Sequence, residues 1–289
     1  MYEFKKIPRK IFHKSSFVLL LTSFFLFSSF SQEEVDLVNV KLINIKDCVS
    51  CSTKATEELL HNVFRGLVFE KIDYRSKKAK ELIDMLEEET LPLFIFDSGI
   101  VKRKNFSDVS HSFIKKDSFY ILKPEFSGIF YYLNRPEIPG RIDLFIDIYA
   151  QDCLSVLKKI KSLAKEKELT LDVHFLFRQK DQAGIEECRR ILSIKRLYPE
   201  KFWDYLFKRL ENIDTSYWNL PMEELGLDVK KIVSFALSEK AEELLEENSA
   251  LTKQLNIGSS YVMLVNNNRI FSVSSGAEGS LESLLDEVI

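Results

Sequence analysis

The chain has 289 residues, of which 45% are hydrophobic and 29% are charged. This composition is typical of a globular protein and is too apolar for an intrinsically disordered chain. The length favours about two domains of roughly 100 to 200 residues each. Glycine and proline are scarce, at 9 and 7 residues, which argues against a long flexible linker.

The first 31 residues have the pattern of a secretory signal peptide. Five Lys or Arg residues precede an apolar run over 17–27, and Ser29 and Ser31 are small residues at the −3 and −1 positions before Gln32. This run is shorter than the about 20 residues that span a membrane as a helix. We therefore expect an exported protein in the periplasm or another extracytoplasmic compartment. A leader that stays uncleaved and anchors the chain in the membrane is the alternative.

The net charge of the remaining chain limits the classes of molecule that it can bind. Without the leader, 36 basic and 43 acidic residues are left, a net charge of −7. An acidic protein lacks the positive charge with which proteins bind the phosphate backbone, so we expect no nucleic-acid partner. No Gly-rich phosphate loop is visible, and only four His residues occur, so hydrolase chemistry is not indicated. We also expect no cofactor.

Strand and helix patterns alternate in the first part of the chain. Apolar and polar residues alternate over 35–45, which predicts a strand. In the segments that follow, alternation predicts further strands, and apolar residues three or four positions apart predict helices. We predict helices over 53–64 and 77–88 and strands over 67–74 and 93–96. The order β-α-β-α-β is typical of an α/β protein with parallel strand pairing.

The pattern restarts after residues 136–140, where two prolines and a glycine suggest a domain boundary. Just before it, 118–123 and 128–133 are predicted as a pair of short strands. After it the order is β-α-β, a helical block, and β-β-α. We predict strands over 141–149, 171–177, 260–265 and 269–273, and helices over 152–166, within 183–255 and over 280–289.

Cys48 and Cys51 form a C-x-x-C motif between the first strand and the first helix. A cysteine at a helix N-terminus has its thiolate stabilised by free backbone N–H groups and by the helix dipole. The thiolate is the form that attacks disulfides. Two intervening residues allow the second thiol to lie close enough to close a disulfide ring. The motif therefore indicates thiol–disulfide chemistry.

This arrangement resembles the thioredoxin family. Leu91-Pro92, before the strand at 93–96, stands where the family has a cis-proline, and Lys71-Ile72-Asp73 is similar to a family pattern whose lysine lies under the active site. The resemblance implies that Cys48 is the nucleophile, that Cys51 resolves the mixed disulfide and that Pro92 shapes the substrate groove. The chain departs from the family at Leu42, where the family has a buried acid, and before the motif, where the usual Trp is absent.

The second half resembles the DsbA-like branch of the thioredoxin fold, which carries a helical insertion. Residues 187–206 are similar to the helices of that insertion, and 256–266 to the segment that enters its last hairpin. The C-x-x-C position reads Ala150-Gln151-Asp152-Cys153, and the cis-proline position reads Ser260 or Tyr261. The resemblance thus implies a second domain that keeps the fold without the dithiol reaction.

Taken together, these patterns predict an α/β protein with two tandem thioredoxin-like domains, the second with a helical insertion. We expect a signal peptide at 1–31, a C-x-x-C domain at 32–137 and a DsbA-like domain at 138–289. The expected activity is exchange of thiols and disulfides in protein substrates, with an unidentified redox partner. The alternative is a non-catalytic binding, chaperone-like or metal-carrying protein.

Two questions about the cysteines stay open at this stage. Cys48 and Cys51 can be a redox pair, a structural disulfide or half of a metal site. A metal site needs two further ligands, and His61, His111 and His174 do not have ligand spacing, so we expect no metal. Cys153 and Cys188 can be buried thiols or a structural disulfide, because four cysteines in an exported protein favour pairing.

Overall fold

The computed structural model describes residues 37–273, except 47, 49, 178–180 and 259–260, and in addition 282, 285 and 286. The predicted signal peptide lies outside these residues, as does most of the predicted helix at 280–289. Within the part described, no helix has the length and hydropathy to cross a bilayer. Residues 36–289 form one unit of the structure.

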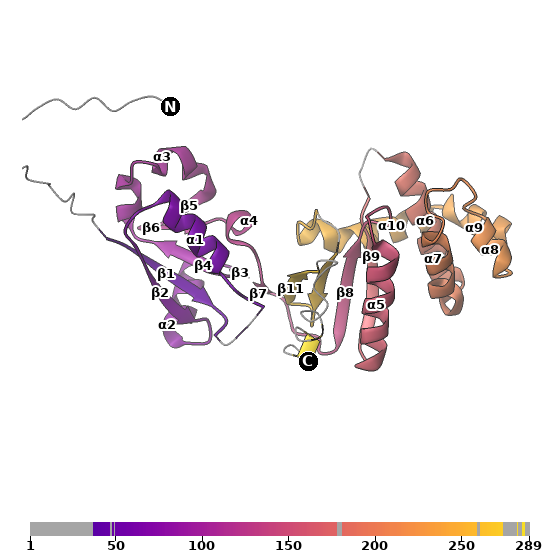
Figure 1. The fold of residues 1–289 in the computed structure, drawn as a ribbon, viewed down its shortest axis with the longest axis horizontal. Helices are drawn as coiled ribbons and strands as arrows, with labels where there is room; N and C mark the ends of the chain where they lie inside the picture. Colours follow the sequence, from indigo (N-terminus) through magenta and orange to yellow (C-terminus); the bar gives the residue numbers. More distant parts are fainter. Residues whose placement is uncertain are drawn as a thin grey trace, which may run out of the picture. The chain divides into compact units, whose positions relative to one another are not determined.

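The first sheet is mixed and has five strands in the order β2-β1-β4-β6-β5. β1 and β2 run parallel and are joined by α1, whereas β4 is antiparallel to β1 (Figure 1). β6 follows antiparallel to β4, and β5 antiparallel to β6. The elements are β1 (Val38–Asn44), α1 (Lys54–Val63), β2 (Leu67–Asp73), α2 (Lys77–Leu86), β4 (Leu93–Phe96), β5 (Phe113–Lys116) and β6 (Phe119–Leu122).

The two faces of this sheet are buried under different helices. Alternate residues of β1 point to opposite faces. Leu42 packs in one hydrophobic cluster with Leu60 of α1, while Ile43 packs in another with Leu86 of α2. Because both faces are covered, the short strand β4 is buried along its whole length.

Several short elements fill the connections. They are β3 (Thr90–Leu91), 3₁₀-helix η1 (Ser98–Lys102), α3 (Phe106–Val109), 3₁₀-helix η2 (Ser110–Ser112), α4 (Pro124–Ser127) and β7 (Tyr131–Tyr132). The prediction that 118–123 and 128–133 pair with each other is wrong. β6 pairs with β4 and β5, whereas β7 pairs with β3 and β11. The reason lies in packing, because Ile121 and Tyr132 are buried in different hydrophobic clusters.

The second sheet is also mixed and has six strands in the order β3-β7-β11-β10-β8-β9. β8 and β9 run parallel and are joined by α5, and the β10–β11 hairpin pairs antiparallel with β8 (Figure 1). Its core order β9-β8-β10-β11 repeats the order β2-β1-β4-β6 of the first sheet, with the same strand directions. The elements are β8 (Arg141–Ile146), α5 (Cys153–Glu166), β9 (Thr170–Phe175), β10 (Val262–Val265) and β11 (Arg269–Ser272).

A helical region separates β9 from β10. It comprises α6 (Gln182–Leu197), 3₁₀-helix η3 (Pro199–Lys201), α7 (Phe202–Leu210), α8 (Leu220–Glu224), α9 (Val229–Ala236) and α10 (Glu239–Gln254). The carboxylate of Glu187 on α6 is fully buried and accepts a hydrogen bond of 2.8 Å from Arg209 Nε on α7. Since a buried charge is tolerated only when it is paired, this contact fixes α6 against α7.

Candidate functional site

The sequence-predicted cysteine pair is joined in the structure. Cys48 and Cys51 form a disulfide with 5.3 Å between their Cα atoms. The loop that carries them lies between the end of β1 and the start of α1, and the backbone N–H of Cys51 donates to the carbonyl of Cys48 at 3.4 Å. Cys51 is buried, at 3% exposure, whereas Cys48 is partly exposed. Cys48 is therefore the sulfur that a partner in solution reaches first.

Helix α1 begins within one residue of its predicted start at residue 53. Its first residue is Lys54, and Thr53 is the N-cap, so both cysteines precede the helix rather than lie in its first turn. The effect of a helix dipole falls off within the first turn. The dipole is therefore a weaker source of thiolate stabilisation for Cys48 than the motif alone implied, and the neighbouring side chains matter more.

Two polar side chains support the loop directly. Asn44, at the end of β1, donates from Nδ2 to the carbonyl of Cys51 at 2.8 Å. Its Oδ1 is buried and has no hydrogen-bond partner among the described residues. Ser50 Oγ lies 3.3 Å from Cys48 Sγ. Because a disulfide sulfur carries no proton, the serine hydroxyl is the donor in this oxidised form.

A cavity of about 530 Å³ lies beside the disulfide and is lined by both charged and apolar side chains. Lys46, Lys54 and Lys71 line it together with Glu57 and both cysteines. Lysine side chains near a cysteine favour its thiolate form. The surroundings of the pair therefore supply positive charge from side chains.

Glu57 is the carboxylate of this cavity that is most firmly held. Its Oε1 accepts hydrogen bonds from Thr53 Oγ1 at 2.7 Å and from Lys71 Nζ at 2.9 Å. Burial alone would raise its pKa, but the hydrogen bonds from Thr53 and Lys71 outweigh burial and lower the pKa below 4.5. Glu57 is therefore ionised at neutral pH, and its lowered pKa makes it a weak base that contributes a fixed negative charge to the cavity.

The sequence analysis missed Glu57, although it recognised Lys71. Leu42, in the position of the family's buried acid, is 1% exposed and lines the same cavity as an apolar wall. The carboxylate that pairs with Lys71 comes from α1 instead. The available signal was the spacing of Thr53 and Glu57, four residues apart at a helix start, which places both on one face.

Pro92 has the conformation that the sequence predicted. The Leu91–Pro92 peptide bond is cis, and Pro92 is buried between β3 and β4. Its neighbours Leu91 and Leu93 belong to the same hydrophobic cluster as Cys51. The proline and the disulfide are thus parts of one packed region, although they are 41 residues apart in the sequence.

The corresponding loop in the second half has a similar backbone and different chemistry. It lies between β8 and α5, and the N–H of Cys153 donates to the carbonyl of Ala150 at 3.2 Å, as Cys51 does to Cys48. With Ala150 in the first position, no sulfur is available to close a ring. Cys153 is 4% exposed, and burial, with a smaller contribution from Asp147, raises its pKa to about 12.

Tyr261 contacts this second loop. It immediately precedes β10, as Pro92 immediately precedes β4, and its backbone has a positive φ of 62°. Its hydroxyl donates to the carbonyl of Gln151, and its N–H donates to Phe145 O at 2.9 Å. Of the two residues predicted for the cis-proline position, Ser260 lies outside the described residues. The tyrosine ties β10 to the loop, although Gln151 and Asp152 of the loop stay exposed.

The disulfide considered for Cys153 and Cys188 is not formed in the structure. Both are free thiols, both are buried, and both belong to the large hydrophobic cluster of the second half. Burial raises the pKa of Cys188 to about 12. A buried neutral thiol packs as a small apolar side chain, so these cysteines fill the core without a covalent link.

His174, which has no ligand spacing in the sequence, lies next to two carboxylates in the folded chain. It lies with Asp143 and Asp172 in a group whose potential ligand atoms are within 4.8 Å of one another. His174 Nε2 is 2.9 Å from Asp143 Oδ1, and Arg141 and Lys195 form ion pairs with the two carboxylates. Because protein cations already compensate these acids, the group is explained as an ion-pair network that is buried at Asp143 and partly exposed at Asp172.

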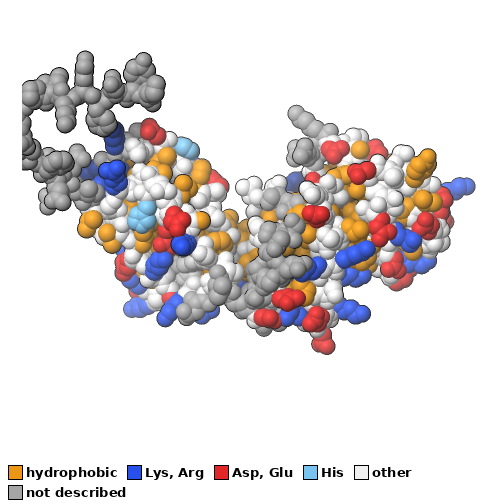
Figure 2. Space-filling model, viewed as in Figure 1, with side chains coloured by type: hydrophobic (Ala, Val, Ile, Leu, Met, Phe, Trp, Pro, Cys, Tyr) orange, Lys and Arg blue, Asp and Glu red, His pale blue; other side chains and the backbone are white. Residues whose placement is uncertain are grey.

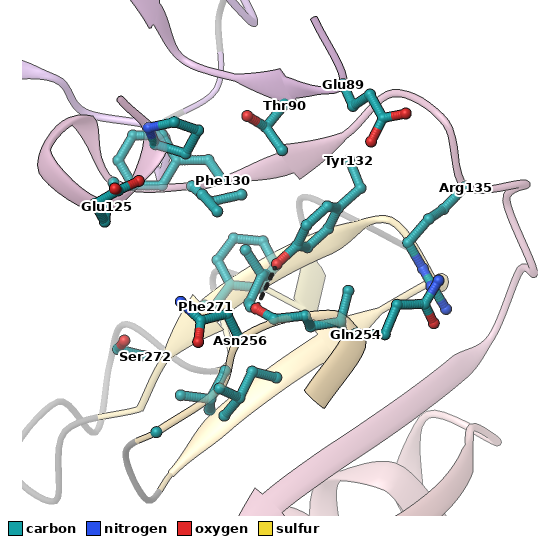
Figure 3. Close-up of a pocket in the computed structure, with 18 of the residues that line it drawn as sticks. Glu89, Thr90, Glu125, Phe130, Tyr132, Arg135, Gln254, Asn256, Phe271 and Ser272 are labelled. Carbon is teal, nitrogen blue, oxygen red and sulfur yellow. Dashed lines mark hydrogen bonds between the residues drawn. The ribbon is translucent and has the colours of Figure 1, made fainter. Parts of the chain in front are cut away.

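A larger groove, of about 1330 Å³, borders the cysteine loop. One wall comes from 89–90 and 124–135 and the opposite wall from 254–258 and 270–272, as Figure 3 shows. Ser50, between the two cysteines, lines it as well. A hydrogen bond of 3.3 Å from Tyr132 Oη to Leu255 O joins the walls. Sequence analysis could not find this groove, because its walls are more than 100 residues apart in the chain.

Comparisons with known proteins give only distant likenesses. No family model matches the chain, and no curated protein matches it. Solved structures that are similar include the thiol-disulfide exchange protein alpha-DsbA2 from Wolbachia pipientis, at 15% identity over 54% of this chain and 88% of that one, with a TM-score of 0.42. A periplasmic thioredoxin-like protein from Salmonella enterica serovar Typhimurium has 15% identity, coverages of 53% and 88% and a TM-score of 0.42. BdbD from Bacillus subtilis has 14% identity, coverages of 53% and 92% and a TM-score of 0.44. With TM-scores below 0.5, these likenesses carry no conclusion about chemistry.

Proposed function

We propose that this chain is a thiol–disulfide oxidoreductase that acts on protein disulfides through Cys48 and Cys51. The observation that carries the proposal is the geometry of this pair: a partly exposed sulfur joined to a buried one in a loop between β1 and α1. The packing of Cys51 in one cluster with the neighbours of the cis-proline Pro92 supports the same function.

The reaction proceeds through two exchanges. In the reduced protein, the Cys48 thiolate attacks one sulfur of a substrate disulfide, forms a mixed disulfide and releases one substrate thiolate. The Cys51 thiolate then attacks Cys48 Sγ, closes the Cys48–Cys51 bond and releases the second substrate thiolate. Two electrons pass from the protein to the substrate, and a dithiol partner restores the reduced form. Run in reverse with a disulfide partner, the same steps oxidise a substrate dithiol.

The neighbouring side chains fit these steps. Lys46 and Lys54 place positive charge in the cavity where a thiolate forms. Ser50 Oγ can donate to a Cys48 thiolate as it now does to the disulfide. The buried Cys51 must lose its proton before it attacks, and the lysine side chains of the same cavity favour its thiolate.

The second half then binds the substrate and takes no part in the disulfide exchange. We propose two tandem thioredoxin-like domains, at 32–137 and 138–289, of which only the first is redox-active. The shared strand order of the two sheets supports the repeat. The loop at Ala150–Cys153, which is hydrogen-bonded to Tyr261, and the buried thiols favour a binding role for the second domain.

The proposed location is outside the cytoplasm, where disulfide chemistry on protein substrates takes place. This rests on the leader pattern of residues 1–31. Protein thiols and disulfides are the proposed substrates, and the redox partner is a second dithiol or disulfide protein.

The deciding experiment is the reduction potential of the Cys48–Cys51 pair, measured by equilibration in glutathione or dithiothreitol buffers with thiol trapping. An oxidoreductase has a value between roughly −120 and −270 mV, and its position in that range gives the direction of transfer. A potential below about −300 mV is typical of structural disulfides and would favour the non-catalytic binding function instead. Cys153→Ser/Cys188→Ser is the background for the measurement, because it removes the other two thiols.

A further inference from the structure

We propose that the groove beside Ser50 binds an extended, positively charged segment of the substrate polypeptide and so selects cationic substrates. This inference rests on the proposed oxidoreductase function, which it extends from a reaction to a substrate class. It is carried by three features of the groove: its size, its connection to the cysteine loop and the sign of its unpaired charges.

The size of the groove excludes a small reductant as its natural occupant. Pockets that enclose small molecules have volumes of about 300 to 1000 Å³. The groove, at about 1330 Å³, exceeds this range. Such a volume fits several residues of an extended chain, which a substrate presents when its disulfide lies in an unfolded or flexible segment.

The groove leads to the reacting sulfur. Ser50 lines it, and Ser50 Oγ is 3.3 Å from the Sγ of Cys48, the partly exposed member of the pair. Cys48 itself lines the smaller cavity, so a segment bound along the groove has to bring its next residues past Ser50 to reach the sulfur. Binding energy gained along the groove would position a substrate sulfur for attack.

The walls offer apolar contacts along the middle of the groove. Ile129 and Phe130 lie on one side, and Ile257, Ile270 and Phe271 on the other. In Figure 3, Phe130 and Tyr132 extend from one wall toward the wall that carries Phe271 and Asn256. Apolar walls bind side chains of many sequences, since the hydrophobic effect is not directional. This breadth suits a protein with varied substrates.

The charges of the groove are acidic on balance. Glu89 and Glu125 are exposed at the wall of the first half, and no ion pair joins either carboxylate to another described residue. Arg135, on the same wall, donates to the backbone and side-chain oxygens of Asn267. Asp286 also lines the groove and is paired with Lys167. Because the oxygens of Asn267 are neutral, Arg135 keeps its positive charge, and the two unpaired carboxylates leave a net charge of about −1 for a substrate to meet.

The rest of the visible surface shows no comparable bias. Figure 2 shows acidic and basic side chains interspersed over the face in view. Because the chain without its leader has a net charge of −7, the effect of the groove has to be measured against that of the whole protein. Exposed ion pairs contribute modestly, and two carboxylates correspond to a preference of roughly two- to tenfold for a cationic segment.

The test uses three matched disulfide-containing peptides whose flanking residues are lysine, glutamine or glutamate. For the mature protein we expect the apparent KM to be lowest for the lysine peptide, by about two- to tenfold relative to the glutamine peptide, and to rise with salt. In Glu89→Gln/Glu125→Gln, this preference should disappear while the KM for the glutamine peptide stays unchanged.

Two further variants separate the effect of the groove's charge from the effect of net charge elsewhere and from binding in the groove itself. Glu200→Gln/Glu243→Gln removes the same net charge at exposed positions that do not line the groove, and it should keep the preference. Ser272→Trp fills the groove from the exposed end of β11 and should raise the KM for all three peptides, without slowing reduction of the Cys48–Cys51 bond by dithiothreitol.

The outcomes distinguish the two proposals. If exchange occurs but all three peptides have the same KM, or if both double variants behave alike, the groove does not select by charge and the inference is wrong. Lower KM for the glutamate peptide would overturn it as well. If the mature protein exchanges with none of the peptides and its disulfide has a structural potential, the proposed function itself fails.

Discussion

The loops at Cys48–Cys51 and at Ala150–Cys153 occupy the same place in two sheets of the same strand order. Both make the same backbone turn, in which the fourth residue donates to the carbonyl of the first. The first loop holds a reachable disulfide, while the second accepts a hydrogen bond from Tyr261 and ends in a buried thiol. The backbone arrangement alone therefore does not make a loop reactive. We attribute the difference to the residue at the first position, Cys48 or Ala150, and to the residue before the third core strand, Pro92 or Tyr261.

The largest effect that separates the two loops is expected from removing their thiols. Cys48→Ser should lower the rate of disulfide exchange by roughly a thousandfold or more, because it removes the nucleophile. Cys153→Ser should leave the rate unchanged, since its thiol is buried and its pKa is about 12. Exchange is measured with a protein disulfide substrate, and comparable losses in both variants would contradict the division of roles.

The next effect compares one acidic residue from each half, each paired with a cation on a neighbouring element of the same half. Glu187→Ala leaves the buried guanidinium of Arg209 without its carboxylate and should cost about 3–5 kcal/mol in the free energy of unfolding. Glu57→Ala should cost about 1 kcal/mol or less, because its partner Lys71 is 67% exposed. Denaturant unfolding measures both. A small cost at Glu187 would show that apolar packing alone fixes α6 against α7.

A smaller effect concerns the acid sensitivity of the second half. Burial alone would raise the pKa of Asp143, but hydrogen bonds from His174 and Arg141 outweigh it and lower the pKa below 3.8. A carboxylate with a lowered pKa stabilises the fold above its unfolded-state pKa, and this contribution is lost as the pH falls through its folded-state pKa. We therefore expect wild-type stability to decline below about pH 4 more steeply than that of Asp143→Asn. Thermal unfolding at several pH values measures the two slopes, and equal slopes would contradict the assignment.

The smallest effect tests how firmly Tyr261 holds the second loop. Tyr261→Phe removes the hydroxyl that donates to Gln151 O and keeps the ring. Loss of one hydrogen bond, about 1 kcal/mol, corresponds to roughly fivefold more frequent opening. The rate at which a thiol reagent labels Cys153 in Cys188→Ser should rise by that factor. Tyr217→Phe, at a side chain that is 71% exposed, is the control and should not change the rate.

Much of the fold followed from local patterns. The strand at Leu93–Phe96 and the parallel β-α-β units at both starts were predicted, because apolar residues with a period of two or of helical spacing mark one buried face. The pairing of the short strands was not, because β6 and β7 are similar in sequence character and only their burial in separate clusters assigns them to different sheets.

By itself, the sequence determined the chemistry that is available. It placed two cysteines at a strand-to-helix junction and a Leu-Pro pair before a strand, and it put alanine where the second half would need a nucleophile. These are properties of residue type and spacing, which local chain geometry converts into structure.

Only the tertiary structure decided which groups surround that chemistry. It brought Glu57 and Lys71 into one cavity with the disulfide, placed Tyr261 against the second loop and formed the groove from segments more than 100 residues apart. Such contacts depend on how helices and strands pack across the sheets, which residue spacing along the chain does not encode. The same holds for Cys153 and Cys188, whose burial in the core decided that they remain thiols in the structure.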